Sequence, residues 1–254
     1  PSRTLLPLST ARSRCSSGQY RGDFSCIEWN AQALFCVDPT RRKAKMRYLT
    51  SLLGRADAVL ITEAHGTPGW HNVFVPPQGT SSWWSAGIST GHAGVGIVVN
   101  SSFLSKFSEP PSWKIIWVGR AAKLVLKGPE GNLEIVVAYF PTGVEVSEAD
   151  KYGALPHLPS DSFPELRRQM RQRIASSLTS RSNALTVLAG DFNYVPTDSD
   201  RMNLNAIAAS GRRDKQEEAH FQAAVSGPHG LHEMFQQEFT YAATSSRARL
   251  DRIY

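Results

Sequence analysis

Six polar side chains stand at the ends of apolar, strand-like runs of this sequence. They are Asn30, Glu63, Tyr139, Asp191, Asn193 and Asp251. Each of them taken alone is explained by a strand meeting a loop, but burying such a group without a partner costs a few kcal/mol, so six together indicate a functional site. Carboxylates, amides and a phenol, without a Cys/His cluster, are hard oxygen donors that suit Mg²⁺ rather than zinc.

Short apolar runs and two longer amphipathic stretches predict the elements that position these residues. Helices are expected over residues 40–53 and 165–179, with a further helical region near 214–224. The Gly128–Asn132 turn predicts that two of the strands form a hairpin. Strands are expected at residues 24–29, 58–61, 95–99, 123–127, 133–139 and 185–189, and from residue 250. Many strands with few helices between them predict mixed sheets packed together, with helices outside.

Composition excludes some classes of protein and leaves others open. The 254 residues are 41% hydrophobic and 20% charged, as in ordinary globular domains, and no run approaches the roughly 20 apolar residues of a membrane span. Three cysteines without Cys-x-x-Cys spacing predict neither a disulfide framework nor a zinc site. The net charge is +6, but residues 1–22 supply four arginines and no acid. The remainder carries +2 (6 minus 4), so a polyanionic partner is allowed but not required.

An ordered set of motifs carries a family resemblance. The motifs are Trp29-Asn30, Ala56–His65 with Glu63 near its end, Gly94–Ile97, Ala138–Pro141, Leu188-Ala189-Gly190-Asp191-Phe192-Asn193, and Arg249-Leu250-Asp251-Arg252-Ile253-Tyr254. Each piece is weak alone, but their order and spacing over about residues 24–254 resemble the endonuclease/exonuclease/phosphatase superfamily of DNase I-like folds. Details such as Glu63-Ala64-His65, Val195-Pro196-Thr197 and Asp200-Arg201 resemble the endonuclease domains of non-LTR (LINE-type) retrotransposons.

The resemblance implies a DNase I-like four-layer α/β sandwich over residues 23–254, preceded by a basic linker or tail over residues 1–22. It implies Mg²⁺-dependent phosphodiester hydrolysis of DNA, with Mn²⁺ as a possible substitute, no membrane partner, and a reverse transcriptase domain further along the parent chain. Such an origin implies a nuclear protein, although no address is readable in the sequence.

The resemblance also implies a role for each site residue. Glu63 and Asn30 hold the metal ion, Asp191 orients or deprotonates the attacking water, and Asn193 fixes this water or a phosphate oxygen. Tyr139 donates to the phosphate. The remaining members are Asp251, which in the family braces a histidine on the phosphate, and the substrate-side neighbours Arg249 and His65.

One part of the family pattern has no match. The family has a Ser-Asp-His segment after the strand that bears Asp251, whereas the sequence continues only to Tyr254. All seven histidines precede that strand, and none matches the phosphate-binding position. We therefore expect a C-terminally incomplete domain with little or no nuclease activity over residues 1–254.

Two alternatives to a DNA endonuclease remain open. One is a phosphatase or phospholipase of the same fold that acts on inositol phosphates or sphingomyelin. The other is a non-catalytic module that binds nucleic acid through the basic clusters at residues 41–45 and 167–173. Trp83 and Trp84 could stack on bases, but we expect them to pack on the protein body.

Overall fold

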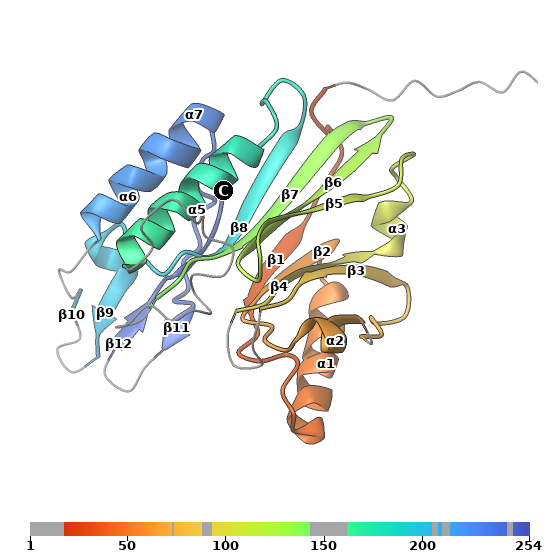
Figure 1. Cartoon of the computed structure of the whole chain (residues 1–254), viewed down its shortest axis with the longest axis horizontal. Helices are drawn as coiled ribbons and strands as arrows, with labels where there is room; N and C mark the ends of the chain where they lie inside the picture. Colours follow the sequence, from red (N-terminus) through yellow and green to blue (C-terminus); the bar gives the residue numbers. More distant parts are fainter. Residues whose placement is uncertain are drawn as a thin grey trace, which may run out of the picture.

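Two β-sheets packed face to face form the centre of the molecule (Figure 1). The computed structural model describes residues 18–254 except 73, 88–92, 143–161, 205–207, 210–213 and 243–245. The first sheet has the order β1-β2-β4-β3, with β1 and β2 parallel and the other pairs antiparallel. Its strands are β1 (Cys26–Asn30), β2 (Ala58–Thr62), β4 (Val95–Asn100) and β3 (Thr80–Ser85).

The second sheet has five strands in the order β13-β8-β7-β6-β5. Strands β7 and β8 run parallel, and all other neighbours are antiparallel, including the predicted β6–β7 hairpin. Its strands are β13 (Asp251–Ile253), β8 (Leu185–Asp191), β7 (Gly131–Tyr139), β6 (Ala121–Gly128) and β5 (Ser112–Trp117).

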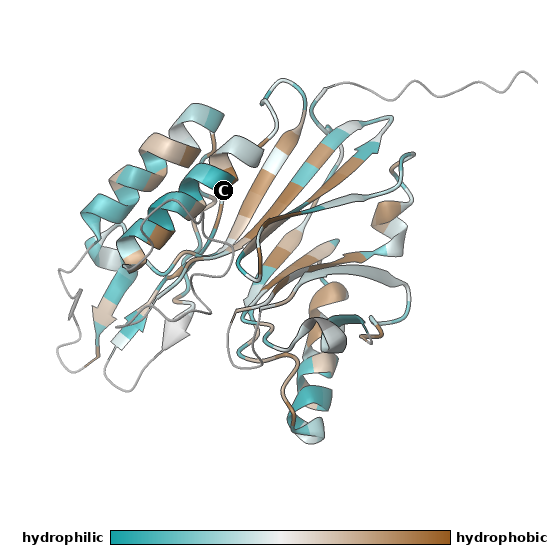
Figure 2. Ribbon diagram, viewed as in Figure 1, coloured by the Kyte–Doolittle hydropathy of each residue, from teal (hydrophilic) through white to brown (hydrophobic). Residues whose placement is uncertain are grey.

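Alternation of side chains explains why the central strands are apolar throughout. In β2, Ala58 and Leu60 pack in the cluster between the two sheets, whereas Val59 and Ile61 pack in the cluster beneath the first helix. Successive residues of a strand point to opposite faces, so a strand that is covered on both sides must be apolar at every position. Figure 2 shows this apolar character along the strands of both sheets.

Helices cover the outer face of each sheet, which gives the predicted four layers (Figure 1). Helix α1 (Pro39–Leu53) packs Leu49, Leu52 and Leu53 on the first sheet, beside the short α2 (Pro68–Asn72). It begins where the Asp38 carboxylate accepts hydrogen bonds from two backbone N–H groups, and it ends at Gly54. The fold class predicted from the sequence is confirmed.

The second sheet is covered by α5 (Phe163–Ser177), whose N-cap is Ser162. The helix starts two residues before the predicted residue 165. The predicted helical region near 214–224 is a run of α6 (Lys215–Phe221), η2 (Gln222–Ser226) and α7 (Gly227–His229). These elements enclose an aromatic cluster that contains Phe140, Phe192 and Phe221. Within the described residues, no helix is long and apolar enough to cross a membrane.

Several elements were not predicted. A third, small sheet has the order β10-β9-β12-β11, and α3 follows β4 directly. Strands β3 and β5 were also missed, and Trp83 and Trp84 of β3 pack on the body as expected. The remaining bounds are α3 (Ser101–Leu104), η1 (Asp198–Asp200), β9 (Arg201–Asn203), β10 (Ala208–Ala209), β11 (Tyr241–Ala242) and β12 (Ser246–Ala248).

The N-terminal boundary of the packed chain differs from the predicted residue 23. Tyr20 is only 4% exposed and packs between the sheets, and Gln19 pairs with Asn132 beside β7. Residues 18–22 therefore belong to the domain. The rest of the predicted tail, residues 1–17, lies outside the described residues.

Candidate active site

The carboxyl ends of two parallel strand pairs meet at one edge of the sandwich. In the first sheet Asn30 ends β1, and Glu63 directly follows the neighbouring β2. In the second sheet Tyr139 at the end of β7 is in register with Asp191 at the end of β8, and Asp251 of β13 pairs with Asp191 from the other side. The topology thus brings five of the predicted site residues to one edge.

A hydrogen bond joins the two sheets at this edge. The Asn30 amide donates from Nδ2 to Oδ2 of Asp191 at 3.2 Å. Beside this bond lies a cavity of about 180 Å³. Its lining residues are Glu28, Trp29, Asn30, Gln32, Asp191, Gln236, Thr240, Leu250 and Asp251.

The Gly190-Asp191-Phe192-Asn193 segment shapes its own part of the site. Gly190 has a φ of +152°, and a Cβ there would lie 1.8 Å from the Ala138 carbonyl oxygen, so only glycine fits. Asn193 adopts a left-handed φ of +52°, which lets its backbone N–H donate to Oδ1 of Asp191 at 2.9 Å. Its amide Nδ2 donates to the Phe140 carbonyl at 2.8 Å. Both oxygens of Asp191 therefore accept hydrogen bonds, which orient the carboxylate.

The site holds an excess of buried acid. Burial, followed by repulsion from Asp251, raises the pKa of Asp191 well above its usual range, although the Asn193 hydrogen bond opposes this shift. Burial also raises the pKa of Asp251 to about 6, against a hydrogen bond from Thr240. Burial and Asp251 raise the pKa of Glu28 in the same way. Buried carboxyl groups with raised pKa values beside a cavity mark a functional-site candidate.

Comparison with known protein families shows which family the sequence matches. The sequence profile of the Endonuclease/Exonuclease/phosphatase family matches residues 27–254. The chain belongs to this family. The match includes Asn30, Glu63, Tyr139, Asp191 and Asp251, the residues that meet at the sandwich edge. No curated protein matches the sequence significantly.

Solved structures with a similar fold include three nucleic-acid enzymes or their domains. An AP endonuclease from Leishmania major superposes with a TM-score of 0.60 at 14% identity, covering 91% of this chain and 78% of that one. The endonuclease domain of TRAS1, a telomere-specific non-LTR retrotransposon, gives 0.53 at 14% identity, covering 91% and 84%. D. rerio TDP2, solved with a single-strand DNA product, gives 0.54 at 14% identity, covering 91% and 82%. At these identities the similarity establishes the fold.

Tyr139 lies in a setting that keeps its phenol protonated. Burial, followed by the negative charge of Glu63, raises the pKa of Tyr139 far above its usual value. The Arg120 guanidinium lies over the ring at 4.6 Å from the centroid and partly offsets this shift. A phenol that stays protonated at neutral pH can donate its hydrogen to an anionic oxygen.

The donor set at the edge fits a Mg²⁺ site of the open kind. Glu63 supplies a carboxylate and Asn30 an amide oxygen, and Mg²⁺ is commonly held by one or two carboxylates while it keeps several waters. Across the described residues, no group of three or more His, Cys, Asp or Glu side chains is arranged to hold a metal ion. A closed cage made only of such side chains is therefore not present in that part of the chain.

The two residues predicted to contact the substrate, Arg249 and His65, have different surroundings in the structure. Arg249 is 4% exposed, and its Nε donates to Oδ1 of Asp200 at 2.8 Å. This guanidinium is buried in an ion pair, so Arg249 supports the fold, and its predicted substrate role stays a prediction. His65 follows Glu63 closely, has a left-handed φ of +57°, and accepts a hydrogen bond at its carbonyl from His71 at 2.9 Å. Its substrate role stays a prediction.

Sequence reasoning missed two members of the site. Glu28 lines the cavity and accepts a hydrogen bond from Thr62 at 2.9 Å. The signal was present, because Glu28 and Asn30 are two residues apart on one strand and must share a face. Arg120 comes from the β5–β6 turn, and nothing in the sequence tied it to Tyr139.

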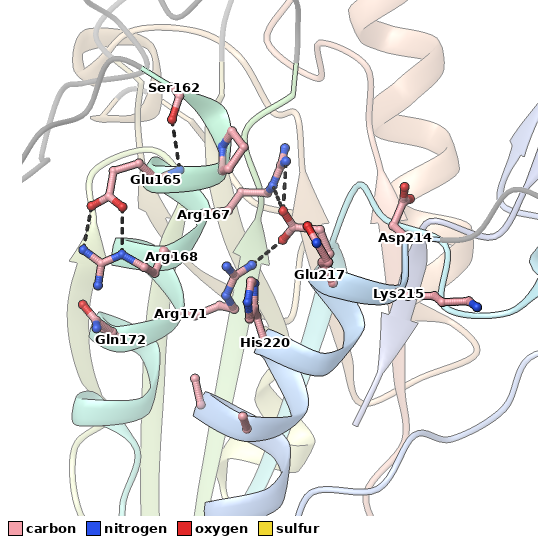
Figure 3. Close-up of a pocket in the computed structure, with 14 residues that line it drawn as sticks. Ser162, Glu165, Arg167, Arg168, Arg171, Gln172, Asp214, Lys215, Glu217 and His220 are labelled. Atoms are coloured by element: carbon pink, nitrogen blue, oxygen red, sulfur yellow. Dashed lines mark hydrogen bonds and ion pairs between the residues drawn. The ribbon is translucent and has the colours of Figure 1, made fainter.

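The basic cluster on α5 is partly paired with acids of the same chain (Figure 3). Arg167 and Arg171 both bind the carboxylate of Glu217 on α6, and Arg168 forms two 2.7 Å hydrogen bonds with Glu165 one turn away. This cluster lines a cavity of about 940 Å³ between α5 and α6. Three of the four arginines in this segment are paired with acids, and Arg173 lies over the Trp117 ring, so the segment gives the binding-module alternative no specific support.

Proposed function

We propose that this site hydrolyses phosphodiester bonds of DNA with Mg²⁺, for which Mn²⁺ can substitute, as the endonuclease domain of a retrotransposon-type protein. The observation that carries the proposal is the Asn30–Asp191 hydrogen bond across the two sheets. It joins the metal-binding pair of the first sheet to the acid of the second, beside Tyr139 and Asp251.

Each residue has a role that its surroundings favour. Glu63 and Asn30 would hold Mg²⁺, which when bound supplies the positive charge that neutralises the phosphate and its leaving oxygen. Tyr139 would donate its phenolic hydrogen to a phosphate oxygen, as its raised pKa permits. Asn193 is held beside Asp191 and would fix the water or a phosphate oxygen with the rest of its amide.

Asp191 is suited to accept a proton from the attacking water. Its carboxylate is oriented by Asn30 and by the backbone of Asn193, and its raised pKa makes it a stronger base than an ordinary aspartate. As the water oxygen bonds to phosphorus, its proton passes to Asp191 and the bond to the leaving sugar oxygen breaks. Asp251 pairs with Asp191 in the sheet and would, by the family's pattern, brace a phosphate-binding histidine, a position that none of the histidines in the sequence matches.

The choice of DNA and of an element-encoded protein rests on sequence motifs and on the similar structures. One of these is the endonuclease domain of a non-LTR retrotransposon, and another was solved with a single-strand DNA product. A reverse transcriptase domain in the same polyprotein belongs to this proposal. A phosphatase or phospholipase of the same fold is the runner-up.

Nicking of supercoiled plasmid by excess protein over long incubation tests the chemistry. None of the histidines matches the family's phosphate-binding position, so we expect slow nicking that requires Mg²⁺ or Mn²⁺. Asp191→Asn should lower the rate by a further factor of about 10² to 10⁴. Glu109→Gln removes an exposed surface carboxylate on the far side of the fold and should leave it unchanged.

Metal binding gives a readout that does not depend on turnover. Mn²⁺ at about 100 times its Kd should stabilise the protein by about 2.7 kcal/mol, and Glu63→Gln should remove this effect while Glu109→Gln retains it. Equal stabilisation of the Glu63→Gln variant would contradict the assigned metal site. Release of phosphate from inositol phosphates without nicking of DNA would favour the runner-up instead.

A further inference from the structure

A groove of about 930 Å³ lies between α1 and α2, outside the catalytic edge. One side is apolar and aromatic, and the other is basic. Its lining residues are Phe35, Pro39, Arg42, Lys43, Met46, Thr67, Gly69, Trp70, Phe74 and Val75.

The aromatic side of the groove is held in place from behind. Phe35 packs against Phe74 with ring centroids 5.3 Å apart and against Trp84 of the first sheet at 5.0 Å. Trp70 and Phe74 are only partly buried by the core cluster beneath α1, and the neighbouring Val75 is 80% exposed. Flat rings therefore remain accessible on a rigid support, as in surfaces on which nucleobases stack.

The basic side belongs to a helix with an unusual charge distribution. Helix α1 contains five cations and no acid. Arg42 donates to the Cys36 carbonyl at 3.2 Å and lies over the Trp70 ring at 5.0 Å, so it joins the two sides of the groove. Lys43 is exposed at the rim. A cationic rim over an aromatic floor complements a strand that has phosphates outside and bare bases inside.

The groove shares its loops with the catalytic edge. The Ala33 N–H donates to the Glu63 carbonyl at 2.7 Å, and the Phe35 N–H donates to the Ala64 carbonyl at 3.0 Å. Lys45 of α1 donates to the Gln32 carbonyl at 2.6 Å in the loop that follows Asn30. A strand leaving the catalytic edge along these loops would reach the groove directly.

We propose that this groove binds an unpaired stretch of DNA beside the bond to be cleaved. Its bases would stack on Trp70 and Phe74, and its phosphates would lie along Arg42 and Lys43. Paired bases have their faces covered by their neighbours in the duplex, so the aromatic floor selects unpaired nucleotides. The inference rests on the proposed function for the identity of the polymer, and it adds a preference for the junction of a duplex with a single strand.

Affinity measurements by fluorescence anisotropy in EDTA test the groove without cleavage. Two probes are compared, a blunt duplex and the same duplex with a single-stranded oligothymidine extension. We expect the wild type to bind the extended probe more tightly, and Trp70→Leu to weaken that binding about tenfold while binding of the blunt duplex is unchanged. Lys43→Gln should lower the slope of log affinity against log salt for the extended probe by about 0.7.

Two matched variants guard against indirect effects. Tyr48→Leu changes an aromatic residue of α1 that is 50% exposed and packs edge-on against Trp29 outside the groove, and Lys114→Gln removes an exposed charge of β5. Both should bind the two probes as the wild type does. Equal affinities of Trp70→Leu and wild type for the extended probe, or equal losses for both probes, would overturn the inference. Equal stabilisation of the wild type and Glu63→Gln by Mn²⁺ would instead count against the proposed function, because binding in EDTA does not require the metal site.

Discussion

Replacement of Asp200 by asparagine should destabilise the protein strongly, although this residue lies outside the catalytic edge. Its carboxylate accepts hydrogen bonds from Arg249 at 2.8 Å and from Arg252 at 3.1 Å. It also accepts from the Thr197 hydroxyl at 2.8 Å. The side chains of Asp200, Arg249 and Arg252 are 2%, 5% and 1% exposed, so water cannot replace the lost charge.

The size of the effect follows from this burial. Removing one member of a buried ion pair costs about 3–5 kcal/mol, because the remaining charge is left without a partner. Arg252 keeps Glu233 as a second partner, which favours a value of about 3 kcal/mol. For a protein of this size each kcal/mol lowers Tm by roughly 2–4 °C, so we expect a decrease on the order of 10 °C.

Thermal denaturation followed by circular dichroism measures this decrease. Asp198→Asn is the matched control, because Asp198 is an exposed acid in the same short helix η1. It should change Tm by less than about 2 °C. A change equally small for Asp200→Asn would refute the view that this carboxylate neutralises the two arginines. Although burial opposes it, the Arg249 hydrogen bond helps to lower the pKa of Asp200, so the difference from wild type should shrink as the pH falls below about 4.

Two further predictions concern the catalytic edge. The pKa of Asp251 is raised to about 6, so the folded state favours the protonated carboxyl. The stability that this proton contributes is fully present below the ordinary carboxyl range and is lost as the pH rises through 6. Urea denaturation of the metal-free protein should therefore show a free energy of unfolding that falls between about pH 4 and pH 7. Asp251→Asn should flatten this decline. An unchanged decline would show that the buried Asp251 carboxyl does not cause it. Gly190→Ala should cost about 3 kcal/mol in the same assay, because the new Cβ meets the Ala138 carbonyl. Gly79→Ala, where φ is also positive but no atom lies within 4 Å, should cost only about 1 kcal/mol, and equal losses would show that the close approach is unimportant.

The parts of the fold that could be predicted are those with a strong local pattern. Strand β2 is apolar at four successive positions, and the β6–β7 hairpin has a five-residue turn signal between two apolar runs. Strand β3, Thr80–Ser85, has no such pattern, because four of its six residues carry hydroxyl groups although its tryptophans pack in the core clusters and Ser85 is buried. Strands of two or three residues, as in the third sheet, are too short to show any periodicity.

Site residues could be predicted where a polar residue ends an apolar strand, and contacts between residues distant in sequence could not. Asn30 and Asp191 stand at strand ends, and 161 residues separate the two partners of their hydrogen bond. Family motifs supplied that pairing, which spacing alone could not. The ion pair of Arg249 could not be predicted because its partner Asp200 is 49 residues away, and only the folded chain brings the two side chains together.

Two buried acidic clusters of the chain differ in role: one stabilises the fold, and one lies at the candidate active site. Near Asp200, two arginines lower the carboxyl pKa against the cost of burial, and Glu233 balances the second arginine, which gives a neutral network. At the sandwich edge, burial followed by repulsion from Asp251 raises the pKa of Asp191. Burial and the charge of Glu63 raise the pKa of Asp251, and Arg252 only partly opposes this second shift. Because the arginines pair with Asp200 and not with the acids at the sandwich edge, the edge keeps the negative charge that can attract a cation. The link between them is the strand itself, since Arg252 in the neutral network is the direct neighbour of Asp251 at the edge. The ion pairs with Asp200 therefore help to place Asp251, so Asp200→Asn should reduce the proposed stabilisation by Mn²⁺ even at temperatures at which the variant stays folded.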